Sequence, residues 1–269
     1  MTAGVPPADW LAFLERIADQ ADDIALRLFR SVTLRVEAKP DRSPVSEADR
    51  AIESMARAYA LEHQPGLGII GEEEGQTVSS GDARLIIDPI DATQNFVRGI
   101  PIFATLLAIE DGGDVVAGVV SAPALRARWT AGRGLGASSA GRRLAVSNVS
   151  ALSEAHLLHA GLGGSTETHP PAGIRDLLDR AARSRGFGDF YQHMLVAEGA
   201  GDVAIDPGVH PWDVAAIQVI VEEAGGKATT LGGARDVYGG SLVTTNGLLH
   251  AEVLDLLGGE ESGSREVGK

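Results

Sequence analysis

LIIDPIDATQNF, at residues 85–96, is the most informative segment of this chain. Residues 84–87 form an apolar strand pattern that we expect to end at Asp88, because the proline that follows fixes φ and cannot donate to a sheet. Asp91 comes three residues later, so both carboxylates and the Ile90 carbonyl between them can face one point. Oxygen-only clusters of this kind bind hard cations such as Mg²⁺.

The residues that follow this cluster predict an anion site beside the cation. If residues 91–96 open a helix, the first backbone N–H groups have no partner within the helix and would bind phosphate. The alternative is an ordinary Asp-Pro turn followed by Asp91 as a helix N-cap, and an arbitrary Asp-Pro pair favours that alternative. Acidic residues elsewhere in the chain decide between the two interpretations.

Two distant segments supply such acidic residues. Glu72 and Glu73 lie in an acidic loop after a strand pattern within residues 68–75, and Asp213 lies at the start of a helix predicted over 212–226. Taken alone, the glutamates are explained by a solvated charge run and Asp213 by an N-cap. Their combination with the Asp-Pro segment favours a shared metal site.

Asp49 has two interpretations, and the sequence leaves both open. Ser46 and Asp49 have the spacing of a capping box, in which each side chain binds the backbone at the start of a helix. The Asp49 carboxylate is equally suited to a metal site.

Composition excludes several other classes of protein and site. The formal net charge of −14 and the pI near 4.9 argue against nucleic-acid binding, which needs Lys and Arg to neutralise phosphates. The absence of cysteine excludes disulfides, thiolate catalysis and thiolate zinc sites. Charges interrupt the apolar residues of the N-terminus, and no run of 18 apolar residues occurs, so neither a signal peptide nor a membrane span is expected. We therefore expect a cytoplasmic protein.

Periodicity predicts an α+β chain with two closely packed halves. Residues 1–147 have helical patterns followed by an antiparallel meander, because consecutive β-like runs are separated by Gly-containing turns. Residues 148–257 alternate strands and helices, and residues 258–269 are predicted to be a disordered tail of Gly, Ser and charged residues. Helices are predicted over 8–30, 47–61, 172–184, 191–200, 212–226 and 248–257.

Three separated motifs resemble the signatures of the inositol monophosphatase family. They are GEE at 71–73, DPIDATQNF at 88–96 and WDVAA at 212–216, and they occur in the family's order and spacing. The resemblance covers nearly the whole chain. It implies a layered αβαβα sandwich of the inositol monophosphatase type, a homodimer, and hydrolysis of a small phosphorylated alcohol.

The resemblance also implies oxygen ligands for two Mg²⁺ ions and for a weaker third. Metals in such a site lower the pKa of the attacking water and hold the attacking and leaving oxygens. The implied ligands are Glu72, Asp88 and the Ile90 carbonyl for the first ion, Asp88, Asp91 and Asp213 for the second, and Asp49 with Glu72 for the third.

Catalytic and phosphate-binding roles follow from the same resemblance. Thr93, close to Glu72, would orient the metal-bound water, and Glu72 and Asp49 are the other implied catalytic residues. Metal charge and the backbone N–H groups of Ala92 and Thr93 would stabilise the charge of the transferring phosphoryl group, and Asp91 is implied as a further substrate-binding residue.

Two residues depart from the family pattern. Ala92 stands where the family usually has glycine. Alanine is harmless there if φ is negative, but costs about 1 kcal/mol of strain if φ is positive. Gln94 stands where lysine or threonine is common, which removes one positive charge near the substrate.

Within the family, the resemblance is strongest to bacterial histidinol-phosphatases, through NFVRGIPIFATLLA at 95–108 and GDFYQHMLVAEGAGDVAIDP at 188–207. This implies histidinol phosphate as substrate, in histidine biosynthesis, with Asp189 and Asp206 as partners for its ammonium group. The alternatives stay open: a helix cap for Asp189 and a turn for Asp206. Arg98 is either a substrate contact or part of a surface salt bridge.

Two further hypotheses about function remain. The first is a phosphatase for an inositol phosphate, a nucleotide or another sugar phosphate, since Asp206 could equally bind sugar hydroxyls. The second is a non-catalytic regulator that binds metal and phosphate, suggested by Ala92. The intact acidic set argues against the regulator.

Overall fold

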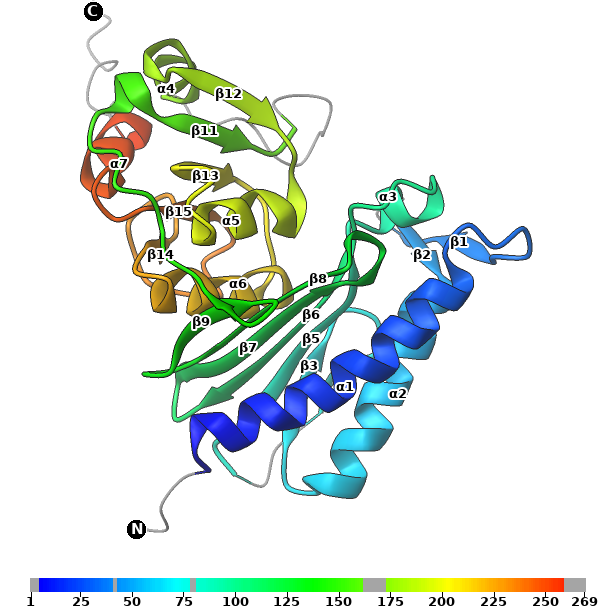
Figure 1. Ribbon diagram of the computed structural model, residues 1–269. Coiled ribbons are helices and arrows are strands. Elements are labelled where there is room, and N and C mark those ends of the chain that lie inside the picture. Colours follow the sequence, from blue (N-terminus) through cyan, green and yellow to red (C-terminus); the bar gives the residue numbers. More distant parts are fainter. Residues whose placement is uncertain (1–4, 41–42, 78–80, 162–172, 259–269) are drawn as a thin grey trace, which may run out of the picture.

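The computed structural model describes residues 5–40, 43–77, 81–161 and 173–258 (Figure 1). Apart from Gly258, the last residue of the final helix, the predicted tail lies outside these residues. No described helix is both long enough and apolar enough to cross a membrane.

An eight-stranded sheet dominates the first half of the chain. Its strand order is β10-β9-β8-β7-β6-β5-β3-β4, and its centre is the predicted antiparallel meander. The one parallel neighbour among the described strands of this sheet is β3 beside β5. The strands are β3 (Gly68–Gly71), β4 (Gly75–Thr77), β5 (Arg84–Asp91), β6 (Ala104–Asp111), β7 (Asp114–Ala122), β8 (Ala127–Gly132), β9 (Gly136–Ser139) and β10 (Arg142–Arg143).

Helices cover both faces of this sheet, as Figure 1 shows. On one face, α1 (Pro7–Leu28) and α2 (Glu47–His63) pack against Leu85 and Ile87 of β5. On the other face, Ile86 packs with α5 (Asp189–Ala197) and α6 (Pro211–Glu223). Because both faces are buried, β5 is a continuous apolar run rather than an alternating one.

A second sheet lies beyond α5 and α6, with strand order β12-β11-β13-β15-β14. Its inner face packs Leu158 and Ala204 against Val196 of α5. Its outer face packs against α4 (Ile174–Arg180) and α7 (His250–Gly258). The layers therefore run αβαβα, as the family resemblance implied. The strands are β11 (His156–His159), β12 (Arg183–Gly186), β13 (Val203–Asp206), β14 (Lys227–Thr229) and β15 (Leu242–Thr245).

Short elements complete the fold at the end of the large sheet where β5 ends. A two-stranded hairpin of β1 (Val36–Ala38) and β2 (Pro44–Ser46) leads into α2, and α3 (Thr93–Val97) follows β5. Two short 3₁₀ turns lie at Pro123–Leu125 and Leu152–Glu154.

The prediction that the strand ends at Asp88 is wrong, because β5 continues to Asp91. The register of β5 against β6 shifts between these two aspartates, which marks a β-bulge, and the Thr105 hydroxyl donates to the Pro89 carbonyl inside it at 2.8 Å. Residues three apart in a regular strand point to opposite faces. One extra residue in a bulge reverses that parity, so both carboxylates face the same side.

Two helix predictions in the second half also need correction. Of the helix predicted over 172–184, the described residues contain α4, which ends at Arg180, and then β12. The strand forms because it pairs in parallel with β11, a tertiary contact that overrides the local pattern. The helix predicted over 191–200 begins two residues earlier, at Asp189, and ends at Ala197.

The close packing of α6 against β7 can be tested by a substitution in β7. A Cβ added at Gly118 would lie 2.6 Å from Val219 Cγ1 and 3.0 Å from the Ala216 carbonyl oxygen of α6. Gly118→Ala should therefore lower the free energy of unfolding by about 1–3 kcal/mol, measured by urea denaturation. Gly232→Ala is the control, because its Cβ would meet nothing closer than 3.7 Å. Equal stability of the two variants would contradict this packing.

Candidate active site

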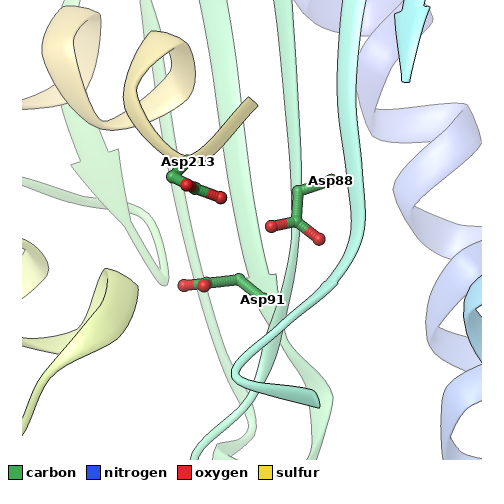
Figure 2. A group of neighbouring side chains, drawn as sticks. All are labelled: Asp88, Asp91 and Asp213. Carbon is green, nitrogen blue, oxygen red and sulfur yellow. The ribbon is translucent and has the colours of Figure 1, made fainter. Parts of the chain in front are cut away.

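Three aspartates converge between the large sheet and α6. One oxygen from each of Asp88, Asp91 and Asp213 lies within 4.8 Å of the others. Figure 2 shows the three side chains pointing toward one another, two from the end of β5 and one from the first turn of α6. The bulge in β5 and the placement of α6 thus bring the predicted acidic residues together.

A capping box fixes Asp213 at the start of its helix. Pro211 is the first residue of α6, and the Asp213 Oδ2 accepts the His210 backbone N–H at 2.7 Å. The interpretation of Asp213 as the N-cap is therefore wrong, because His210 is the N-cap and Asp213 is the third helical residue. The same Asp213 carboxylate therefore accepts the capping-box hydrogen bond and lies close to the other two aspartates.

Burial makes this cluster electrostatically unfavourable without a cation. Asp88 is 2% exposed, and its Oδ1 has no hydrogen-bond partner among the described residues. Burial, followed by the charge of Glu72, raises the pKa of Asp88 well above its ordinary value. Burial also raises the pKa of Asp213 to about 6. An orphaned buried oxygen among like charges fits a divalent cation, which would supply the missing partner.

Asp91 is held by a backbone N–H group at the start of α5. Its Oδ2 accepts the Phe190 backbone N–H at 2.6 Å, at the start of α5. Burial, followed by the charge of Asp189, raises the pKa of Asp91 well above its ordinary value. The helix-cap alternative for Asp189 is wrong, because α5 begins at Asp189 itself and no side chain caps it.

Asp49 and Thr93 form a second polar group of the site. Asp49 Oδ2 accepts the Ser46 N–H at 2.8 Å and the Ser46 hydroxyl at 2.6 Å, which confirms the capping box. Asp49 Oδ1 lies 3.2 Å from the Thr93 hydroxyl, which is also 2.9 Å from the Ile90 carbonyl oxygen. The cap therefore leaves one Asp49 oxygen facing the site, so capping and a metal role are compatible.

Glu72 lies outside the group of three aspartates, and its contact was not predicted. Lys39 Nζ is 2.7 Å from Glu72 Oε1 and 2.6 Å from Glu73 Oε1. The charge of Glu72 nevertheless contributes to raising the pKa values of Asp88 and Asp49, after burial. Nothing in the pattern around Lys39 signals this ion pair, since its two partners are 33 and 34 residues away along the chain.

A cavity of about 880 Å³ opens beside these residues. Its lining includes Glu72, Ala92, Thr93, Asp189 and Asp206. A smaller cavity of about 90 Å³ is lined by Asp91 and Asp213 together with Asp189 and Asp206, which also line the large one.

The predicted substrate contacts differ in their surroundings. Burial raises the pKa of Asp189 to about 6, and burial followed by the charge of Asp189 raises the pKa of Asp206 to about 7. Arg98 is exposed and is not among the lining residues of the large cavity. The lining of the cavity is therefore acidic at Asp189 and Asp206 as well as at Glu72.

The raised pKa values predict how pH and Mg²⁺ act on stability. The carboxyl pKa values of about 6 for Asp213 and about 7 for Asp206 exceed the ordinary 3.8, so protonation stabilises the metal-free fold at low pH. That contribution is lost as pH rises through about 6 to 7. Mg²⁺ binds the charged form, so the increase in Tm on adding Mg²⁺ should be larger at about pH 8 than at about pH 5.

Thermal unfolding with Mg²⁺ or with chelator checks this expectation. Asp213→Asn is the variant to compare with the unaltered protein, because it removes one of the three clustered negative charges and keeps the shape of the side chain. It should raise the Tm of the metal-free protein at about pH 8 and reduce the increase caused by Mg²⁺. An equal Mg²⁺ effect at both pH values in the unaltered protein would contradict the prediction.

Ala92 has a left-handed backbone, with φ of +65°. An alanine there is strained by about 1–2 kcal/mol, and glycine would relieve this at a smaller cost in unfolded-state entropy. Ala92→Gly should therefore raise the free energy of unfolding by about 1 kcal/mol, measured by urea denaturation.

Ala60→Gly is the control for Ala92→Gly, because Ala60 lies in the helical interior of α2. There the same substitution should destabilise the protein by about 1 kcal/mol. Destabilisation by both substitutions would show that Ala92 is not strained.

Comparison with known proteins agrees with this geometry. The model of the inositol monophosphatase family matches residues 7–259. A histidinol-phosphatase of Mycobacterium tuberculosis is 45% identical over 246 residues, which cover 90% of this chain and 95% of the relative. An inositol-1-monophosphatase of Rhizobium meliloti is 36% identical over 220 residues, 79% and 82% of the two chains.

Solved structures extend the comparison to the fold. The crystal structure of the extragenic suppressor protein suhB from Bartonella henselae has a TM-score of 0.87 and 28% identity, and covers 95% of this chain and 100% of that one. The inositol monophosphatase of Thermotoga maritima has a TM-score of 0.83 and 31% identity, over 93% and 96% of the two chains. This protein belongs to the inositol monophosphatase family.

Proposed function

We propose that this protein is a Mg²⁺-dependent phosphatase that hydrolyses histidinol phosphate to histidinol and phosphate. The observation that carries the proposal is the convergence of Asp88, Asp91 and Asp213, two of which line a cavity together with Asp189 and Asp206. The aspartate cluster suits a cation with phosphate, and Asp189 and Asp206 suit a positively charged alcohol. The family membership supports phosphomonoester hydrolysis.

The metal site would hold two Mg²⁺ ions through Glu72, Asp88, the Ile90 carbonyl, Asp91 and Asp213, with a weaker third ion between Asp49 and Glu72. When bound, the ions supply positive charge that activates water and neutralises phosphate. The orphaned Oδ1 of Asp88 and the mutual repulsion of the aspartates support this assignment.

The chain's own residues would position the attacking water. The Thr93 hydroxyl is a donor to the Asp49 or Ile90 oxygen, which leaves its lone pairs free to accept a hydrogen bond from water. Asp49 is in turn held by two hydrogen bonds from Ser46, so the acceptor cannot rotate freely. The Thr93–Asp49 pair would thus orient the water toward the phosphorus atom.

The alcohol group would bind beside Asp189 and Asp206. Asp189 and Asp206 are held there in partly desolvated positions, since burial raises the pKa of each. An ammonium group placed between them would favour the charged carboxylates and would be bound by charge-assisted hydrogen bonds. This is the chemistry that histidinol phosphate offers and inositol phosphate lacks. The 45% identity to a histidinol-phosphatase supports the same substrate.

An inositol-phosphate phosphatase is the second candidate, and the identity to the Rhizobium enzyme favours it to a lesser degree. The hydroxyl groups of the inositol phosphate would donate hydrogen bonds to the Asp206 carboxylate. A homodimer and a cytoplasmic location stay predictions of the family resemblance and of the composition. The exposed position of Arg98 does not support a contact with a substrate bound in the same chain.

A panel of phosphomonoesters with Mg²⁺ tests the substrate. We expect kcat/KM for histidinol phosphate to exceed that for inositol 1-phosphate by at least about tenfold, because one charge-assisted contact contributes about 1.5–3 kcal/mol. A nucleoside monophosphate and glycerol phosphate complete the panel. Higher kcat/KM for inositol 1-phosphate would favour the second candidate, and no phosphate release from any substrate would favour a regulator.

Asp189→Asn tests whether this preference depends on the carboxylates of the cavity. It should raise KM for histidinol phosphate about tenfold, with little change for inositol 1-phosphate, because it removes the charge that pairs with the ammonium group. Asp179→Asn, on the exposed side of α4, is the control for the change in net charge. Equal effects of Asp189→Asn on both substrates would contradict the ammonium site.

A further inference from the structure

The turn that carries Glu72 is bound to a buried carboxylate in α2. Glu53 is fully buried, with 0% of its surface exposed. Its Oε2 accepts the Glu73 N–H at 2.7 Å, and its Oε1 accepts the Glu74 N–H at 2.9 Å. Both N–H groups belong to the turn between β3 and β4, directly after Glu72. The backbone on the C-terminal side of Glu72 is therefore fixed by one side chain.

Arg57 completes this arrangement from the same helix. Its Nε and Nη2 donate to Glu53 Oε1 at 2.9 and 2.7 Å, and its Nη2 also donates to the Gly75 carbonyl at the end of the turn. The Arg57 side chain is only 12% exposed. One guanidinium thus neutralises the buried carboxylate and binds the turn, which is the condition under which a buried ion pair is tolerated.

Gly71, the residue before Glu72, has no side chain and so leaves room for the Glu53 carboxylate. A Cβ at Gly71 would lie 2.1 Å from Glu53 Oε1 and 2.8 Å from Arg57 Nη2. No side chain fits there without displacing the ion pair. The backbone on both sides of Glu72 is therefore matched to Glu53.

The spacing along α2 connects this ion pair to the rest of the site. Asp49, Glu53 and Arg57 are four residues apart and so lie on one face of the helix. Asp49 contacts Thr93, while Glu53 and Arg57 bind the turn of Glu72. One rigid helix face sets the distance between the two groups.

We propose that Glu53 is a positioning residue that holds the Glu72 carboxylate in place for cation binding. The inference rests on the proposed function, in which Glu72 is a ligand. Without Glu53, the Glu73 and Glu74 N–H groups lose their acceptor and the turn is free to move. Arg57 would keep the Glu74 carboxylate, at 3.6 Å, and the Gly75 carbonyl as partners, but neither replaces the acceptor that the two N–H groups lose.

Calorimetric titration of the substrate-free protein with Mg²⁺ tests this role, because it needs no turnover. Glu53→Gln should raise the Mg²⁺ Kd about tenfold, the lower end of the range for residues that support metal ligands. Gly71→Ala should raise it similarly, since it displaces Glu53 and leaves every charge in place. Arg57→Lys retains a cation and the acceptor of the turn, so its Kd should rise less than that of Glu53→Gln.

Glu222→Gln is the matched control. Glu222 accepts hydrogen bonds from Arg133 and Arg235, as Glu53 does from Arg57, but it lies in the last turn of α6 and Asp213 in the first. It should lower Tm and leave the Mg²⁺ Kd unchanged. Unchanged Kd values in both Glu53→Gln and Gly71→Ala would overturn the proposal. No Mg²⁺ binding by the unaltered protein would instead overturn the proposed function, and this inference with it.

Discussion

Mutual repulsion among buried carboxylates is the constraint on which this structure depends. Asp88, Asp91 and Asp213 approach within 4.8 Å, and burial raises the pKa of each. A fold built only for stability would separate these charges or pair them with cationic side chains. Here the neighbouring cation, Lys39, pairs with the glutamates instead. The arrangement is consistent with a site whose missing charge comes from outside the chain.

The fold maintains the acidic site by holding three of its carboxylates through backbone groups. The Phe190 N–H binds Asp91, the His210 N–H binds Asp213 and the Ser46 N–H binds Asp49. Each of these donors lies at or near the start of a helix, where N–H groups lack partners and the helix dipole favours negative charge. Helix starts from three parts of the chain therefore offset part of the electrostatic cost.

The acidic residues and the meander could be predicted because they depend on local motifs and on periodicity, whereas the layered fold was implied by the resemblance of three motifs to the inositol monophosphatase family. The bulge after Asp88 was not predictable, since it follows from pairing with β6. The Phe190 contact with Asp91 spans 99 residues and involves a backbone donor, which no residue pattern signals. The φ of Ala92 was left open because either sign agreed with the motif, and the observed +65° lies in the left-handed region that favours glycine.

The position of α6 between the two sheets has a consequence for how the protein reaches its working state. This helix covers the inner face of the large sheet through Ile217 and Ile220, and its first turn carries Asp213. A chain that has assembled only its first sheet lacks both the cover for that apolar surface and one member of the acidic cluster. Asp213 therefore joins Asp88 and Asp91 only once both halves have docked, so the three-aspartate cluster belongs to the fully assembled fold alone.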